Sequence, residues 1–210
     1  MNFNLKELAR IFLHLIFPVT CPVCGAPSEI ICPECLKTLI NENTINTKIF
    51  NDFNNFEIFT GAAYEGNITR AIQSLKYKNN KSIGRPLGKI LASVIKQPDE
   101  INFLIPVPLH IDSTRNFNQS LEIAKGMAEI WNVKILDAAI WSKIVPRRVG
   151  LNATERKLLS DDVFKIILDV KNTNAAIVDD VCTTGTTLLR LKQALENSGA
   201  KILKAYTLAG

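Results

Sequence analysis

One stretch near the carboxyl end of the chain constrains the possible folds more than any other. Residues 175–178 are all apolar, and they are followed at once by Asp179 and Asp180. Four threonines then surround Gly185, and residues 188–198 carry leucines at helical spacing. A short apolar run bounded in this way is typical of a buried parallel strand. The stretch therefore predicts a strand, a tight loop and a helix, in that order.

The predicted loop has the composition of a phosphate site. A loop that leaves a parallel strand and enters a helix aims backbone N–H groups and the positive end of the helix dipole at one point. Gly185 would let the backbone approach an anion closely, and hydroxyl groups would add further donors. Those hydroxyls belong to Thr183, Thr184, Thr186 and Thr187. A P-loop ATPase is disfavoured, because the G-x-x-x-x-G-K-[ST] pattern is absent here and no lysine follows Gly185.

The two acids before the loop predict a second feature of the ligand. Asp179 and Asp180 would repel a bare phosphate, but carboxylates accept hydrogen bonds from hydroxyls such as those of a ribose. A ligand with a 5′-phosphate and a ribose diol fits both halves of the motif. The alternative is an acidic turn that only caps a helix.

Four of the five cysteines fall within residues 21–35, as two Cys-x-x-Cys pairs. They are Cys21, Cys24, Cys32 and Cys35. Four thiolates at this spacing are typical of a tetrahedral Zn²⁺ site, and a segment with so few core residues needs such a crosslink. Because all four ligand positions are filled, we expect the Zn²⁺ to be structural. The alternative, two redox pairs, is disfavoured because no strand is predicted before either pair.

The net charge of +5 is modest, but the positive charge is unevenly distributed. Residues 66–98 contain seven basic side chains and no acidic one, and residues 138–154 form a second acid-free stretch with Arg147 and Arg148. We expect a surface that binds single-stranded DNA where the first stretch turns between two helices. The residues concerned are Lys76, Lys78, Lys81 and Arg85. Solvated helix faces are the alternative.

The order of the predicted elements indicates an α/β fold. We expect an amphipathic helix at 4–17, a linker at 41–55, strands at 56–64, 103–108 and 201–208, one or two short strands within 133–145, and helices at 67–77, 82–96, 117–131 and 151–159. Such alternation favours a mostly parallel sheet flanked by helices.

We divide the chain into residues 1–45, with the helix and the zinc module, and residues 46–210, the main domain. The apolar segment 11–19 is too short to span a bilayer, so we expect a cytoplasmic protein without stable membrane insertion.

Further motifs carry a resemblance over nearly the whole chain. They are Tyr64-Glu65-Gly66, Leu75-Lys76-Tyr77, the run from Ile105 to His110, the run from Arg115 to Gln119, Glu155-Arg156 and the Asp179-Asp180 loop. With the four cysteines, they resemble the ComF/GntX family of competence-associated, phosphoribosyltransferase-like proteins. The loop itself is similar to the signature of type I phosphoribosyltransferases, which hold phosphoribosyl pyrophosphate (PRPP).

The resemblance implies a type I phosphoribosyltransferase domain that binds PRPP with Mg²⁺ and acts in natural transformation, where imported single-stranded DNA is handled in the cytoplasm. It implies Asp179 and Asp180 as catalytic and PRPP-binding residues and the threonine loop as the 5′-phosphate site. Arg115 and the helix start at 117–119 would lie near the pyrophosphate, and His110 is either a turn residue or a ligand contact. Other DNA-uptake proteins are implied as partners.

The alternative function is a catalytic phosphoribosyltransferase, a glycosyltransferase of nucleotide metabolism or salvage. The chain shows no recognisable base-binding segment, which counts against this alternative. It also departs from the family pattern, since Asn116 replaces a glycine and Leu159 an asparagine. These departures bear on any second substrate site and on transfer chemistry.

Overall fold

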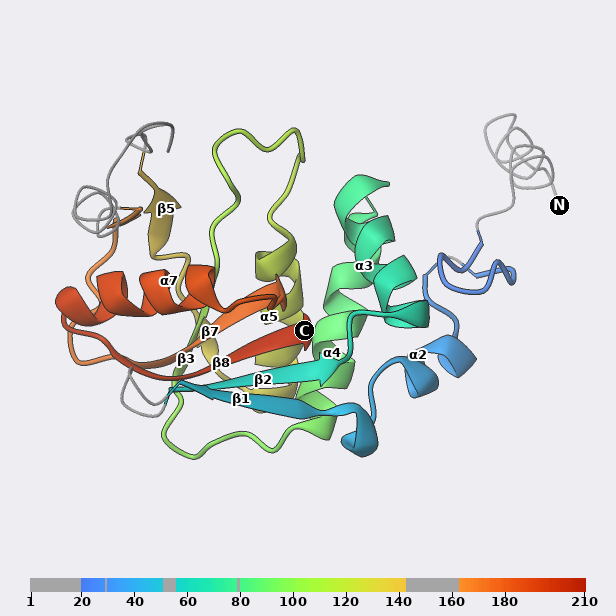
Figure 1. Ribbon diagram of the computed structural model, residues 1–210, viewed down its shortest axis with the longest axis horizontal. Helices are drawn as coiled ribbons and strands as arrows, with labels where there is room; N and C mark the ends of the chain where they lie inside the picture. Colours follow the sequence, from blue (N-terminus) through green and yellow to red (C-terminus); the bar gives the residue numbers. More distant parts are fainter. Residues whose placement is uncertain (1–19, 29, 51–55, 79, 143–162) are drawn as a thin grey trace, which may run out of the picture.

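The computed structural model describes residues 20–28, 30–50, 56–78, 80–142 and 163–210, and its centre is a six-stranded sheet (Figure 1). The strand order is β1-β2-β8-β7-β3-β4, antiparallel between β1 and β2 and parallel elsewhere. The strands are β1 (Asn46–Phe50), β2 (Phe56–Ala62), β3 (Phe103–Pro106), β4 (Lys134–Ile135), β7 (Asn174–Val181) and β8 (Lys201–Ala209). The expected mostly parallel α/β fold is confirmed.

Helices cover both faces of this sheet. They are α3 (Gly66–Tyr77), α4 (Gly84–Val94), α5 (Gln119–Trp131) and α7 (Thr186–Asn197), whereas the short helix α2 (Pro33–Leu39) packs on α3 and α4. Val178 and Tyr206 of the sheet share an apolar cluster with α3, α4 and α5. Ile177 and Ala205 belong to a second cluster with α7. Because neighbouring strand residues point to opposite faces, the apolar runs in β7 and β8 supply both cores at once.

The helices α4 and α5 cross at two glycines. A Cβ atom on Gly88 would lie 2.0 Å from the carbonyl oxygen of Ile123, and one on Gly126 would lie 2.1 Å from that of Arg85. No side chain can be tolerated at such distances, so the two backbones meet directly. This contact fixes α4 against α5, whose first turn enters the candidate site.

The cysteine segment packs into the same core as α3 and α4. Cys21, Val23 and Leu39 are buried within the cluster that contains those helices. The Arg70 guanidinium of α3 also donates a hydrogen bond to the Val23 carbonyl at 3.3 Å. Figure 1 shows α2 beside α3 and α4, at the end of the molecule away from α7. The segment is therefore joined to the helical layer through side-chain packing as well as through the chain.

A small second sheet lies apart from the main one. Its strands β5 (Ala139–Trp141) and β6 (Phe164–Ile166) are antiparallel and pack within the α7 cluster. β4 and β5 agree with the one or two strands expected at 133–145, whereas β6 was not predicted. With three residues, β6 is too short to show a clear period.

The linker prediction was wrong for residues 41–50. A 3₁₀ helix, Glu42–Thr44, is followed by β1, which pairs with β2 as the edge strand of the sheet. An edge strand exposed on one side needs few apolar residues, and polar residues dominate this one.

The expected helices at 4–17 and 151–159, together with Arg147, Arg148 and Glu155-Arg156, lie outside the described residues. No helix in the part of the chain that the structure describes is long and apolar enough to cross a membrane.

Candidate ligand-binding site

The candidate site lies where the central strands β3 and β7 end. Pro106 of β3 pairs with Val178 of β7, so the residues after both leave the sheet at the same edge. The Val107 N–H donates to the Val178 carbonyl at 2.9 Å, and the Asn118 side chain donates to the Val107 carbonyl at 3.0 Å. Asn118 also caps α5 by accepting from the Leu121 N–H. The end of β3, the end of β7 and the start of α5 are thereby held together.

Two acids occupy the end of β7. Asp179 accepts hydrogen bonds from the Ser120 hydroxyl at 2.7 Å and from the Asp180 N–H at 2.8 Å. Asp180 is buried and pairs with Lys76 of α3, with 2.8 Å between Nζ and Oδ1. The carboxylates therefore receive their partners from two different helices, α5 and α3.

The pKa of Asp179 is raised from its ordinary value to about 7. Burial is the main cause, and repulsion by the neighbouring Asp180 carboxylate is the next. The hydrogen bonds to Asp179 and the charge of Lys76 oppose this rise in pKa without cancelling it. The Asp179 side chain can therefore hold or release a proton near neutral pH, a property that is common at functional sites.

The threonine loop follows β7 and begins α7. Gly185 is the N-cap of that helix with a φ of 78°, in the left-handed region where glycine is favoured. A Cβ atom there would also lie 2.8 Å from the Phe50 ring, so the loop rests on β1. Thr184 and Thr186 are exposed and their hydroxyls lie 2.9 Å apart. The first N–H groups of α7 and these hydroxyls surround a small cavity of about 30 Å³.

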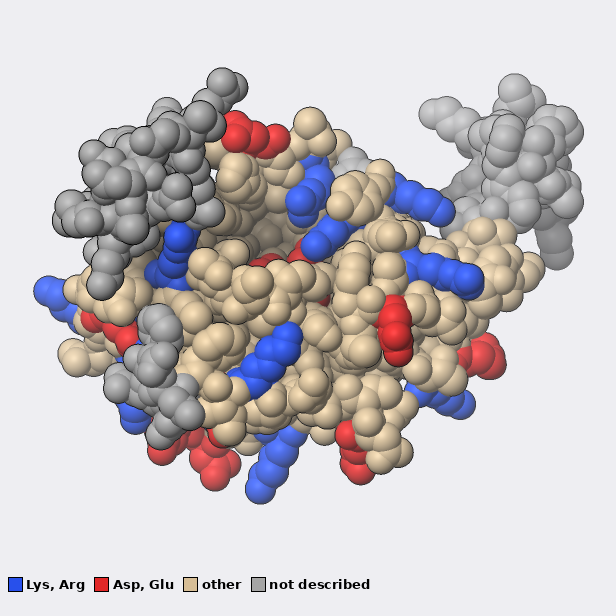
Figure 2. Space-filling view, in the orientation of Figure 1, with Lys and Arg blue, Asp and Glu red and all other residues tan. Residues whose placement is uncertain are grey.

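Two larger cavities continue from the loop. The central cavity, about 180 Å³, shares Asp179 and Thr187 with the threonine-loop cavity. The outer cavity, about 430 Å³, shares Lys76 and Arg115 with the central one. Figure 2 shows a hollow in the upper half of the molecule with basic and acidic side chains beside it. The order along the site is therefore threonine loop, acids, then two cations.

One wall of the central cavity contains an amide group without a complete set of partners. Gln119 is 2% exposed, and its Oε1 accepts a hydrogen bond from Arg115 at 2.7 Å. Its Nε2 has no hydrogen-bond partner among the described residues. An unpaired buried donor is costly, so this group fits a site whose ligand supplies an acceptor.

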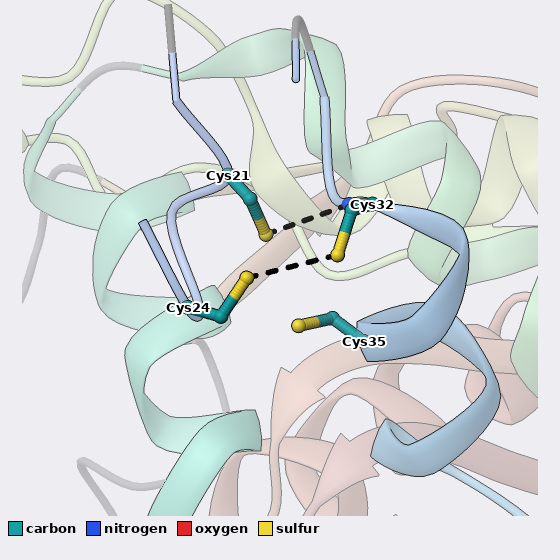
Figure 3. A group of neighbouring side chains, drawn as sticks. All are labelled: Cys21, Cys24, Cys32 and Cys35. Carbon is teal, nitrogen blue, oxygen red and sulfur yellow. Dashed lines mark hydrogen bonds between the residues drawn. The ribbon is translucent and has the colours of Figure 1, made fainter. Parts of the chain in front are cut away.

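The four cysteines form a compact cluster (Figure 3). Their sulfur atoms all lie within 4.8 Å of one another, with 3.7 Å between those of Cys24 and Cys32, and none is in a disulfide. A tetrahedral ion with metal–sulfur bonds of about 2.3 Å would separate its sulfur ligands by about 3.8 Å. Burial raises the pKa of the Cys21 thiol, but hydrogen bonds led by the Cys32 N–H outweigh it and lower the pKa to about 6. The cluster can therefore hold a metal ion, as its spacing predicted.

Comparison with known proteins agrees with this arrangement. Residues 81–210, more than half of the chain, match the model of the phosphoribosyl transferase domain family. The chain belongs to that family. With the relatives named below and the cysteine cluster, the resemblance to ComF/GntX proteins is confirmed.

The relatives of this phosphoribosyl transferase domain protein include proteins named for DNA use and competence. DNA utilization protein YhgH of Escherichia coli O6:H1 is 26% identical over 203 residues, covering 90% of this chain and 82% of that protein. Competence protein ComFC of Streptococcus pneumoniae is 25% identical over 184 residues, covering 84% and 79%. Competence protein F of Haemophilus influenzae is 28% identical over 156 residues, covering 66% of each. Among solved structures, adenine phosphoribosyltransferase from Leishmania tarentolae matches with a TM-score of 0.39 at 15% identity, over 66% of this chain and 59% of that one.

The four basic residues that were predicted to bind DNA do not all lie on one surface. Lys76 lies at the candidate site rather than on the outer face of α3. Lys81 pairs with Glu122 at 3.4 Å, and Arg85 pairs with Glu129. Both acids belong to α5, so the stretch without acids in sequence meets acids in space.

Lys78 is exposed, and no ion pair of its side chain occurs among the described residues.

The sequence did not assign Ser120 or Lys76 to the pocket. Lys76 belongs to the motif Leu75-Lys76-Tyr77, but its position in the sequence did not indicate that its side chain would point from α3 into the pocket. Ser120 carried no signal beyond its place beside Gln119.

Proposed function

We propose that the pocket binds PRPP together with Mg²⁺. The observation that carries this proposal is the adjacency of two complementary half-sites: the carboxylates of the half-buried Asp179 and the buried Asp180, and a threonine loop at the start of a helix. Asp179 and Asp180 would accept hydrogen bonds from the ribose hydroxyls, and residues 183–187 would hold the 5′-phosphate. Arg115, at the other end of the central cavity, would face the pyrophosphate, which carries the Mg²⁺.

The proposed biological role is the handling of imported single-stranded DNA during natural transformation. The printed names of the relatives, which refer to competence and DNA utilization, support it. We place this activity in the cytoplasm, with other DNA-uptake proteins as partners. The exposed side chains of Lys78, Lys81 and Arg85 would contact the DNA backbone. Lys81 and Arg85 would do so while they also pair with glutamates of α5.

The alternative is catalysis of glycosyl transfer in nucleotide metabolism or salvage. It is favoured by the Asp179 side chain, whose pKa of about 7 suits a group that exchanges protons near neutral pH. Asp179 and Asp180 would then be catalytic residues that contact the ribose while a nitrogen nucleophile displaces pyrophosphate. Release of pyrophosphate from PRPP on addition of a nucleobase would favour the alternative, and binding without release would favour the first proposal.

We expect Asp180→Asn to weaken PRPP–Mg²⁺ binding by at least tenfold in calorimetric titration. The reason is that a hydrogen bond to a charged acceptor contributes about 1.5–3 kcal/mol. Asp99→Asn is the matched control, because Asp99 is exposed in the turn before the opposite end of β3. Equal affinities of wild type and Asp180→Asn would contradict the assignment of this carboxylate to the ribose.

We also propose that the cysteine cluster binds one structural Zn²⁺. Metal analysis of protein prepared without chelator should give close to one zinc per chain. Cys21→Ser combined with Cys24→Ser should remove the metal and disorder residues 20–40, as measured by amide hydrogen exchange, because the thiolates are this segment's crosslink. Cys182→Ser is the control, since Cys182 lies in the threonine loop, away from the cluster. Protein that lacks zinc and yet keeps these amides protected would contradict the proposal.

For the DNA surface, the test is a double charge reversal, Lys78→Glu with Lys81→Glu. Single-strand affinity should fall relative to wild type, and its dependence on salt should become shallower. The log–log slope should change by about 0.7 for each phosphate that the variant no longer neutralises. PRPP affinity should stay nearly unchanged, because neither side chain lines the cavities.

The matched control for this DNA test reverses the exposed Lys96 and Lys171. It changes the net charge by the same amount at positions outside the proposed surface. An equal loss of DNA affinity in both double variants would show that only net charge matters, and would contradict a defined surface.

A further inference from the structure

Lys76 differs from its neighbours at the end of α3. Its side chain is 17% exposed, whereas Tyr77 is 76% exposed and Lys78 is also exposed. Its ammonium group reaches 2.8 Å from the buried Asp180 carboxylate. Burying a lysine is unfavourable without such a partner, so the ion pair explains why the side chain turns inward.

Lys76 lies at the boundary between two cavities of the site. Together with Arg115, it lines both the central cavity and the outer cavity. The threonine loop opens into the central cavity at the Asp179 and Thr187 side. Two cations therefore stand beyond the acids, on the side where the site continues outward.

The charges around this boundary favour a second anion. Gln119, held by Arg115, also lines the central cavity, and its buried Nε2 has no hydrogen-bond partner among the described residues. Asp112 also lines the outer cavity, but its side chain is 87% exposed and its charge is screened by water. A lysine ammonium on a flexible four-carbon stem has three donors, so it can contact Asp180 and a ligand anion together.

We propose that Lys76 is a specificity-determining residue that contacts the ligand's second anionic group, at the end remote from the 5′-phosphate. It would make the pocket prefer a sugar phosphate with anionic groups at both ends over one with a single phosphate. This inference rests on the proposed function. It removes Lys76 from the DNA surface and assigns it to the pocket.

The test compares two ligands on three variants by calorimetry in the presence of Mg²⁺. Lys76→Met keeps an unbranched stem and removes the ammonium group, Lys76→Arg keeps the charge, and Lys78→Met is the matched exposed control. We expect Lys76→Met to weaken PRPP binding by about 10- to 100-fold, in line with one charge-assisted contact. Ribose 5-phosphate, which lacks the second anionic group, should lose no more than about threefold. Lys76→Arg should recover most of the PRPP affinity, and Lys78→Met should bind both ligands as wild type does.

The ratio of the two affinities decides the outcome. Equal weakening of both ligands would overturn the inference and leave Lys76 as a residue that only positions Asp180. Unchanged PRPP binding in Lys76→Met would overturn it as well. Because unfolding of Lys76→Met would also weaken both ligands equally, its far-UV circular dichroism is compared with that of wild type, and Lys76→Gln replaces it as the neutral variant if the spectra differ. A wild-type chain that binds neither ligand would overturn the proposed function together with the inference. That result differs from a failure of the inference alone, in which wild type binds both ligands.

Discussion

Two neighbouring carboxylates at the end of the central strand are the constraint on which the site depends. Asp179 and Asp180 stand side by side in a cavity where water cannot fully solvate them, so their charges repel and the pKa of Asp179 rises. The fold offsets this cost with the Ser120 hydroxyl and the Lys76 ammonium. A chain selected for stability alone would place apolar residues here. The ligand proposed above, whose ribose hydroxyls would donate hydrogen bonds to the pair, would account for two acids at this position.

The rest of the structure holds these compensating groups in place. Ser120 is fixed because α5 is capped by Asn118 and meets α4 directly at two glycine positions. Lys76 is fixed because α3 shares its apolar cluster with α4 and with the buried cysteines, and because Arg70 bonds to the cysteine segment. The cysteine cluster is therefore mechanically connected to the pocket through α3, although the cysteines and the acid pair belong to opposite ends of the sequence.

Local patterns predicted the elements whose signal is contained in one stretch. The strand, acid pair, loop and helix around Gly185 and the four-cysteine cluster were predicted correctly because their spacing alone specifies them. The edge strand β1 was predicted as a linker, because an edge strand needs few apolar residues and polar residues dominate this one. The basic stretch appeared unopposed because Glu122 and Glu129, which neutralise Lys81 and Arg85, come from α5. The inward turn of Lys76 depends likewise on Asp180, roughly half the chain away.

The most direct test of whether the acid pair lowers the stability of the fold is the free energy of unfolding of Asp179→Asn, measured as a function of pH. The folded-state pKa of Asp179, about 7, lies above the ordinary value of 3.8, so its charge should destabilise the fold progressively as pH rises from about 4 to 7. Asparagine keeps the hydrogen-bond acceptor without the charge. In urea unfolding, Asp179→Asn should match wild type near pH 4 and exceed it by about 1–3 kcal/mol at pH 8. The control Asp99→Asn should show no such trend. An Asp179→Asn variant less stable than wild type at pH 8 would contradict the account.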